Sequence, residues 1–556
     1  MKAHLLHRDS EFDWRPPLEE AALREAARNG RRNQTRTCDP LRGLPWNADT
    51  LTADLALTTL FETMAHGDDC VFEVSRRAVL AGVSGDIDTI SYRQAVLQDC
   101  LAHPAVIREL YAVAVEAMAE QQRHYLGSFF SRYPDAVLRH GIDLLSAMLG
   151  LLRKLRRIAD AQAGNFASEG ATKFFAMLQR DLDDYYLARV QRDLEELKLR
   201  EGALLSAALG KGNRGANYVL RRFPQRPMSW WRRLVDALDR LVLRWRGRIE
   251  ACPARLRPQA SPVYSFALHP RDEAGARALA ELRNRGIALV ADALAQSADH
   301  VRDFFGMLQA ELAFYVGCLN LNQALARKGE PMCMPVPAPA DEQGLKVRGL
   351  YDVCLAIKLE KRAVGNDVAG TGKPLVIVTG ANTGGKSTFL RSLGLAQLMM
   401  QAGMFVGAEE FQASLASGVF THYKREEDAG MKSGKLDEEL SRMSDIVDHL
   451  HPGALMLLNE SFAATNEREG SEVARQIMTA LLDKQIRIVC VTHLYELARG
   501  FLARNTGDTL FLRAGRTRTF KLLEGEPLPT SYGEDLYKDI FGDRVPPEVD
   551  LPAAAQ

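Results

Sequence analysis

A glycine-rich segment in the last third of the chain has the residue types and spacing of a phosphate-binding loop. Residues 380–387 fit the pattern G-x-x-x-x-G-K-S, with an apolar run before them and helical text after them. Glycines let the backbone wrap an anion without Cβ clashes, so that N–H groups and a helix N-terminus point at the phosphate. We therefore expect a nucleotide to bind at Gly380, Ala381, Asn382, Thr383, Gly384, Gly385, Lys386, Ser387 and Thr388.

The polar side chains of this loop indicate that the nucleotide binds together with Mg²⁺. Lys386 places a positive charge against the outer phosphates. Ser387, or alternatively Thr388, supplies a hydroxyl ligand to the metal. Hydrolysis of the nucleotide needs further groups, which other parts of the chain have to supply.

A second candidate motif is the apolar run Leu455–Leu458, which leads into Asn459 and Glu460. A nucleotide hydrolase needs one group in the Mg²⁺ shell and one carboxylate that activates the attacking water. Glu460 is placed for the water, and Asn459 stands where an aspartate is usual. Because the amide of Asn459 adds no negative charge, we expect weaker Mg²⁺ binding or slower turnover.

A third candidate is His493, which follows the apolar run Ile486–Thr492. Side chains at the carboxyl ends of parallel strands face the crevice in which ligands bind. We therefore expect His493 to sense the γ-phosphate. The alternative is a histidine with a structural role at the end of a strand.

The elements that position these residues change in type near residue 340. Before it, the chain is rich in Ala, Leu, Arg, Glu and Gln, residues with high helix propensity. After it, the short apolar runs Leu375–Thr379, Leu455–Leu458 and Ile486–Thr492 are each followed by helical text. This alternation is typical of βαβ units and predicts a parallel sheet.

Apolar spacing of three and four predicts helical stripes in the first part of the chain. These stripes comprise Ile142, Leu145, Leu149, Leu152 and, separately, Leu178, Leu182, Tyr185. Between Pro270 and Pro331 there is no proline, and one helix of about 60 residues would reach on the order of 90 Å. Such helices suit arms or levers, although an ordinary bundle is the alternative. Glycines predict a break or bend at positions 275, 286, 306 and 317.

A basic stretch interrupts the sequence that predicts helices. Between Arg221 and Arg257 there are eleven arginines and three acidic residues, with tryptophans interleaved. Arginine neutralises phosphates and tryptophan stacks on bases, so we expect DNA contacts at Arg221, Arg222, Trp230, Trp231, Arg232 and Arg233. A solvated or packed helix and a membrane-surface helix are the alternatives. The flanking runs predict short strands at Ala203–Leu209, Tyr218–Arg222 and Val263–Leu268.

Composition limits the class of protein. The 556 residues include 71 Lys+Arg and 71 Asp+Glu, so the chain as a whole is no polycation. The best apolar run, around Leu144 to Leu152, is too short for a membrane span, and we expect no membrane partner. The eight cysteines fit neither zinc pairs nor a disulfide framework, which favours a reducing cytoplasm.

The motifs together resemble the ATPase domain of the MutS family, the mismatch-repair ATPases of the ABC class. The sequences GANTGGKSTFLRSLGLAQLMM, NES before EREGSEVA, and VTHLYELA have the order and spacing of that domain. The resemblance is strong over residues 345–540 and weaker over 50–340, where Tyr92–Leu110 resembles the family's helical core. It implies a multidomain chain, with a mainly α-helical core and lever region followed by an α/β ABC-type P-loop ATPase domain.

The resemblance also implies ATP and Mg²⁺ as ligands and a homodimer of head-to-tail ATPase domains. A signature segment of the partner would cover each nucleotide, with Ser433 and Gly434 as the candidate trans residues. The usual serine-rich text is replaced by Lys435–Glu439, so a solvated charged helix is the alternative. The residues before the core contain no F-x-E wedge, so mismatch reading by that device is not expected. The segment Val364–Asp367 has no aromatic neighbour that could stack on adenine.

We interpret the chain as a cytoplasmic MutS-like ATPase of DNA repair or recombination, which binds duplex or branched DNA and couples ATP to dimer closure and lever movement. Two other interpretations stay open: a nucleotide-gated scaffold that scarcely hydrolyses ATP, and an ABC ATPase that serves a protein or membrane partner. The expected divisions are an N-terminal lead at 1–50, a helical core at 51–200, a basic arm at 201–268, lever helices and a linker at 269–340, and the ATPase domain at 341–556.

Overall fold

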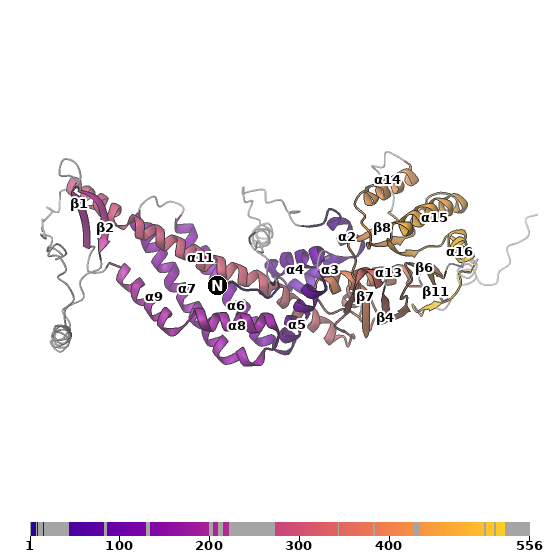
Figure 1. The fold of residues 1–556 in the computed structure, drawn as a ribbon, viewed down its shortest axis with the longest axis horizontal. Coiled ribbons are helices and arrows are strands. Elements are labelled where there is room, and N and C mark those ends of the chain that lie inside the picture. Colours follow the sequence, from indigo (N-terminus) through magenta and orange to yellow (C-terminus); the bar gives the residue numbers. More distant parts are fainter. Residues whose placement is uncertain are drawn as a thin grey trace, which may run out of the picture. The chain divides into compact units, whose positions relative to one another are not determined.

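The computed structural model shows helices in the first part of the chain and a mixed α/β domain after them (Figure 1). The chain forms two compact units that are each discontinuous in sequence. One unit comprises Met1–Val115, Leu155–Asp181 and Phe304–Gln556, and the other comprises Glu116–Lys154 and Leu182–Asp303. The structure describes residues 2–6, 8, 15, 44–82, 86–128, 134–199, 204–209, 215–221, 273–342, 344–381, 384–425, 434–504, 507–515 and 519–528.

Two of the helices in this part begin at aspartates that cap them. Asp68 accepts hydrogen bonds from the Cys70 and Val71 amides, and Asp86 accepts one from Thr89. Such caps satisfy amides that have no partner inside the helix. The described helices of this part are α2 (Ala48–Asp54), α3 (Leu57–Ala65), α4 (Asp69–Ala81), α5 (Ile87–Ala102), α6 (Pro104–Ser128), α7 (Pro134–Gln162), η2 (Ala163–Asn165), α8 (Glu169–Asp181), α9 (Asp184–Leu197) and α11 (Glu273–Arg327).

Helix α11 corrects two expectations about the proline-free stretch. It runs without interruption for 55 residues, so its glycines cause no break, and the alternative of a bend stays a prediction. Gly317 has a packing role instead, because a Cβ there would lie 2.8 Å from Ser75 Oγ of α4. The expectation that no apolar run approaches membrane-span length is also wrong. The stretch Ala280–Arg327 passes that test of length and composition, but 89% of its apolar window is buried inside the structure, as in a core helix.

The second unit confirms one helical stripe and corrects the other. Ile142, Leu145, Leu149 and Leu152 are all buried on α7. Tyr185 is 75% exposed, and it does not continue the stripe because α8 ends at Asp181 and Tyr185 belongs to a separate helix, α9. The expected strands at the start of the basic stretch are present as the antiparallel pair β1 (Leu204–Leu209) and β2 (Gly215–Arg221). The predicted strand Val263–Leu268 lies outside the described residues.

A six-stranded sheet forms the centre of the α/β domain, and its order is β12-β11-β6-β10-β9-β8. Every neighbouring pair is parallel except β11 with β12. The three strands predicted from the apolar runs are confirmed, and they lie side by side as β6, β10 and β9. The strand bounds are β6 (Leu375–Gly380), β8 (Val419–Tyr423), β9 (Leu455–Asn459), β10 (Arg487–Val491), β11 (Thr509–Ala514) and β12 (Leu522–Glu524).

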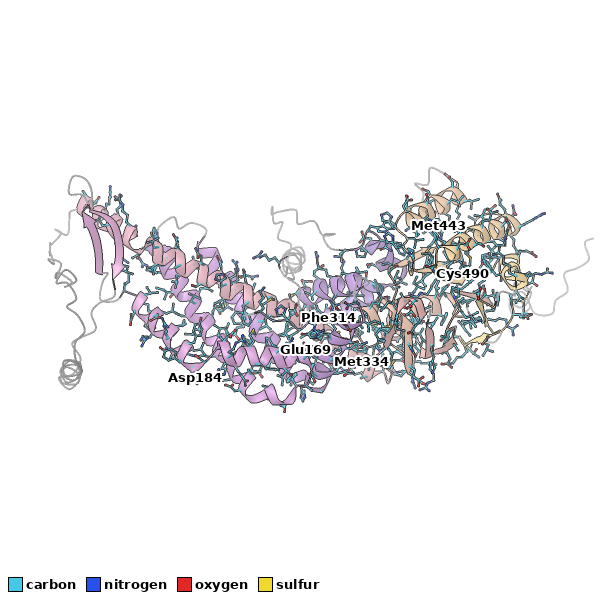
Figure 2. The ribbon with its side chains drawn as sticks, viewed as in Figure 1. Glu169, Asp184, Phe314, Met334, Met443 and Cys490 are labelled. Atoms are coloured by element: carbon cyan, nitrogen blue, oxygen red, sulfur yellow. The ribbon has the colours of Figure 1, made fainter. Side chains whose placement is uncertain are left out.

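Helices cover this sheet because successive residues of a strand point to opposite faces. On one face, Ile377, Leu458 and Cys490 pack in an apolar cluster with Met443 and Phe501, which lie on covering helices (Cys490 and Met443 are labelled in Figure 2). The covering helices are α14 (Lys435–Val447), α15 (Glu467–Asp483) and α16 (Tyr495–Arg504), which Figure 1 shows grouped together.

Helix α13 (Lys386–Gln401) contacts strands of both sheets of the domain. The second sheet is four-stranded, with the order β3-β7-β4-β5. Its first strand lies in the proline-rich segment that we expected to be a linker, and it pairs with β7. The remaining elements of this part are β3 (Val336–Ala338), η4 (Ala340–Glu342), β4 (Leu345–Leu350), α12 (Val353–Lys358), β5 (Asn366–Ala369) and β7 (Glu410–Ser414).

The first residues of the chain are held in the helical core by a buried carboxylate. The amides of Leu5 and Leu6 both donate to Oε2 of Glu311, whose side chain is buried on α11. Tyr315 donates to the Leu5 carbonyl and Arg93 to the Leu6 carbonyl. An apolar segment can enter the core in this way because its backbone groups find partners there.

We expect Glu311→Ala to lower the free energy of unfolding by about 1–3 kcal/mol, because two buried amides would lose their acceptor. Guanidinium unfolding measures the change. The control is Gln323→Ala, an exposed position on the same helix, which should change stability by less than about 0.5 kcal/mol. Equal losses for the two variants would contradict the assigned role of Glu311.

Candidate nucleotide site

The register of the sheet brings the three sequence motifs to one edge. Val378 of β6 lies opposite Val491 of β10, and Val491 lies opposite Asn459 of β9. The glycine-rich loop, the Asn459–Glu460 motif and His493 each follow one of these three parallel strands. Parallel strands end at the same edge of a sheet, so residues from distant parts of the sequence become neighbours.

The described glycines of the loop after β6 have backbone conformations that suit an anion-binding turn. Gly380 has φ +110°, and a Cβ there would lie 2.5 Å from the Ala514 carbonyl oxygen of β11. Gly385, with φ +88°, is the N-cap of α13, so the first amides of that helix face the loop. Of the predicted loop residues, Asn382 and Thr383 lie outside the described part of the chain.

Lys386 is buried and its ammonium group lies over the loop. Its Nζ donates to the carbonyl oxygens of Gly380 at 2.8 Å and Ala381 at 3.0 Å. Burial lowers the pKa of Lys386, and the charge of Glu460 opposes that shift. A negatively charged ligand in the loop would compensate the desolvated ammonium group.

Ser387 and Asn459, the two candidate metal ligands, are in direct contact. Ser387 Oγ donates to Asn459 Oδ1 over 2.8 Å. Among the described residues, no group of three or more His, Cys, Asp and Glu side chains could hold a metal. A hydroxyl and an amide oxygen suit Mg²⁺, which takes most of its ligands from phosphates and water. Thr388, the alternative hydroxyl, also lines the cavity described next.

A cavity of about 690 Å³ opens beside the loop. Its lining includes a residue that the sequence reasoning missed, Phe520. The Phe520 carbonyl accepts a hydrogen bond from Asn366 Nδ2, and Asn366 Oδ1 accepts one from the Leu522 amide. No pattern in the sequence signals this pairing, because more than 150 residues separate the partners. Among the lining residues are Leu350, Tyr351, Leu355, Val364, Asn366, Gly385, Lys386, Ser387, Glu460 and Phe520.

Glu460 lines the cavity on a strained turn. It has φ +53°, and Phe462 has φ +62°, although neither residue is glycine. Left-handed backbone costs such residues on the order of 1 kcal/mol or more, so the surroundings have to impose it. The Glu460 amide donates to the Val491 carbonyl at 2.8 Å, which fixes the turn to β10.

His422 lies fully buried beneath this turn. Its Nδ1 is 2.8 Å from Ser461 Oγ, and its Nε2 is 3.0 Å from the Glu439 carbonyl oxygen. Its ring also stacks on Phe462, with 5.3 Å between centroids. Burial is the main cause that lowers the pKa of His422 to about 4, and the charge of Arg442 adds to it. The imidazole is therefore neutral at physiological pH.

The other predicted site residues have different surroundings. His493 follows β10 as expected, but it is exposed and is not among the residues that line the cavity. Gly434 is the N-cap of α14, whereas Ser433 lies outside the described residues. Arg221 ends β2, and its side chain is not described. The remaining predicted DNA contacts also lie outside the described residues: Arg222, Trp230, Trp231, Arg232 and Arg233.

The parallel sheet, the glycine loop and the buried lysine together define a P-loop nucleotide-binding domain attached to a helical region. Two family models match the corresponding parts of the chain. The MutS2 N-terminal domain matches residues 85–328, and MutS domain V matches residues 376–516. The chain belongs to the MutS family, as the sequence motifs predicted.

Curated relatives agree with this family. Proteins named endonuclease MutS2 from Streptococcus pneumoniae strains Hungary19A-6 and CGSP14 are each 30% identical over 224 residues. The aligned part covers 39% of this chain and 28% of each relative. The match thus extends over less than a third of the relatives' length.

We expect the stability of the protein to fall as the pH drops from about 6.5 toward 4, because of His422. In this window the unfolded chain binds a proton that folded His422 excludes, so stability rises with pH by up to about 3 kcal/mol. Thermal or denaturant unfolding across this range measures the slope. His422→Gln should flatten it.

Exposed His451 provides the matched control, because its replacement by Gln should leave the slope unchanged. An equal slope in wild type and His422→Gln would contradict the buried neutral imidazole.

Proposed function

We propose that the protein is an ATPase that couples ATP binding and hydrolysis to pairing of its α/β domains and to DNA binding. The observation that carries this proposal is the convergence of Lys386, the Ser387–Asn459 pair and Glu460 around one cavity. A nucleotide hydrolase needs groups that bind the phosphates, hold Mg²⁺ and activate water, all within reach of one triphosphate.

The residues divide the reaction between them. Lys386 binds the outer phosphates, exchanging its loop carbonyls for phosphate oxygens. Ser387 and Asn459 would hold Mg²⁺, which neutralises phosphate charge when bound. Glu460 orients a water molecule and accepts its proton while the water oxygen bonds to the γ-phosphorus. The bond from that phosphorus to the bridging oxygen breaks, and ADP leaves with the bonding electron pair.

The cavity suits a flat nucleotide base, for which we propose adenine. Leu355, Val364 and Phe520 give it an apolar lining beside the phosphate loop. A flat aromatic base gains dispersion and stacking energy from such walls. Phe520 would supply the aromatic surface that the segment Val364–Asp367 lacks in the sequence.

A second copy of the chain and DNA complete the proposed machine. Gly434 is the N-cap of α14, and together with Ser433 it would reach the nucleotide of the partner. His493 would sense the γ-phosphate, an assignment that requires it to turn toward the ligand. The arginine- and tryptophan-rich stretch would bind duplex or branched DNA in repair or recombination. The six described cysteines are unpaired thiols, which supports a cytoplasmic location.

Replacement of single loop and strand-end residues separates binding from hydrolysis. Lys386→Ala should weaken ATP binding at least about tenfold, because phosphate charge loses its partner. Glu460→Gln should keep ATP binding and lower turnover by about 100-fold or more, because the amide cannot accept the proton. Fluorescent-ATP titration and phosphate release measure the two quantities.

A nucleotide-gated scaffold with little hydrolysis is the second candidate, and Asn459 in place of a metal-binding carboxylate favours it. In that case wild type and Glu460→Gln would show the same slow turnover, while ATP still promoted dimer formation. Absence of ATP binding would contradict both functions.

DNA binding should depend on salt and on the basic stretch. We expect Arg232→Ala/Arg233→Ala to weaken binding and to reduce the slope of log affinity against log salt by about 2. Gel shifts with homoduplex, mismatched and branched DNA, with and without ATP, measure both effects. Indifference to salt and to these substitutions would favour a protein or membrane partner instead.

A further inference from the structure

The turn that carries Glu460 needs support from outside β9. Glu460 and Phe462 both have left-handed backbones without being glycine. Such strain persists only where neighbouring groups fix the conformation. The groups that fix Phe462 and Ser461 come from α14 and β8, which lie more than 20 residues earlier in the chain.

Glu439 of α14 supplies two of these contacts. Its carboxylate accepts a hydrogen bond from the Phe462 amide. Its backbone carbonyl lies 3.0 Å from His422 Nε2, and the other ring nitrogen lies 2.8 Å from Ser461 Oγ. Because the carbonyl can only accept, Nε2 of His422 carries a proton that it donates there. The Ser461 hydroxyl lies 2.8 Å from Nδ1 and 2.8 Å from the His422 carbonyl oxygen, to which it donates. One residue of α14 therefore holds both residues that follow Glu460.

The burial of the Glu439 carboxylate costs free energy, and its hydrogen bond from the Phe462 amide offsets only part of that cost. The side chain is only 1% exposed, and its Oε1 has no hydrogen-bond partner. Desolvation raises the pKa of Glu439. A leucine would fill such a place in an ordinary amphipathic helix without this penalty. Met443, one turn later on the same face, is an apolar residue packed in the cluster under the sheet.

We propose that Glu439 is a positioning residue for hydrolysis, which sets the orientation of the Glu460 carboxylate by holding the Phe462 amide and the His422–Ser461 pair. This inference rests on the proposed function of Glu460. It also links the helix whose N-cap is Gly434, the candidate partner contact, to the catalytic carboxylate of the same chain.

The first test measures turnover and ATP affinity in the full-length protein. Glu439→Ala should lower kcat by about 10- to 100-fold, because small misplacement of a catalytic group costs this much. The KM and the dissociation constant of a fluorescent ATP analogue should stay within about twofold. Glu439→Gln should stay near wild type, because its amide oxygen still accepts from Phe462.

Met443→Ala is the matched control for packing of α14. It should lower the melting temperature at least as much as Glu439→Ala, with a much smaller loss of kcat. In the Glu460→Gln background, Glu439→Ala should cause little further loss, because both changes act on one group. Equal kcat for Glu439→Ala and Met443→Ala, or no rescue by Gln, would overturn the proposal.

Hydrogen exchange makes the outcome independent of ATPase activity. The Phe462 amide should exchange faster in Glu439→Ala and stay protected in Glu439→Gln and Met443→Ala. Unchanged protection in Glu439→Ala would by itself disprove the positioning role. A different result would separate the two proposals: the wild-type protein shows no turnover, but Glu439→Ala still loses protection of the Phe462 amide. That result would refute hydrolysis by Glu460, and with it the catalytic effect of the contact, while the contact itself would stand.

Discussion

The register of three parallel strands is the constraint on which the candidate site depends. Val378, Val491 and Asn459 lie side by side in β6, β10 and β9. A shift of one residue in β9 would turn Asn459 to the opposite face of the sheet and remove its hydrogen bond with Ser387. The consecutive apolar residues of these strands are buried on both faces, and their packing against neighbouring elements holds the register. Core packing therefore sets the geometry of the polar edge.

Polar groups buried near that edge cost desolvation free energy, and they fix the conformation of the turn that carries Glu460. Lys386, His422 and Glu439 are all desolvated. Burial lowers the pKa of Lys386 and His422 and raises the pKa of Glu439, which in each case favours the neutral form. The loop carbonyls, Ser461 and the Phe462 amide give them partners, so the cost is partly offset by hydrogen bonds. The result is a rigid surround for Glu460 in a conformation that an isolated chain would not favour.

Part of the helical region shares one compact unit with the α/β domain. Helix α13 follows the phosphate loop and contacts α4, and Gly394 of α13 fits closely against Leu55, between α2 and α3. The first residues of the chain join the same unit through Glu311 of α11. The helices α2 to α5 therefore pack in the same compact unit as the nucleotide site.

The sequence by itself determined the parallel strands, the glycine-rich loop and the family, whereas the contact between Ser387 and Asn459 depends on the strand register. The first three have local signals, because glycine spacing and short apolar runs act over a few residues. It misjudged Tyr185 and the glycines of α11, since helix ends and interhelical contacts depend on distant residues. Only the tertiary structure decided that Phe520 meets Asn366 and that Glu439 meets Phe462. Those contacts join segments that no local pattern relates, and packing of the whole domain sets their distance.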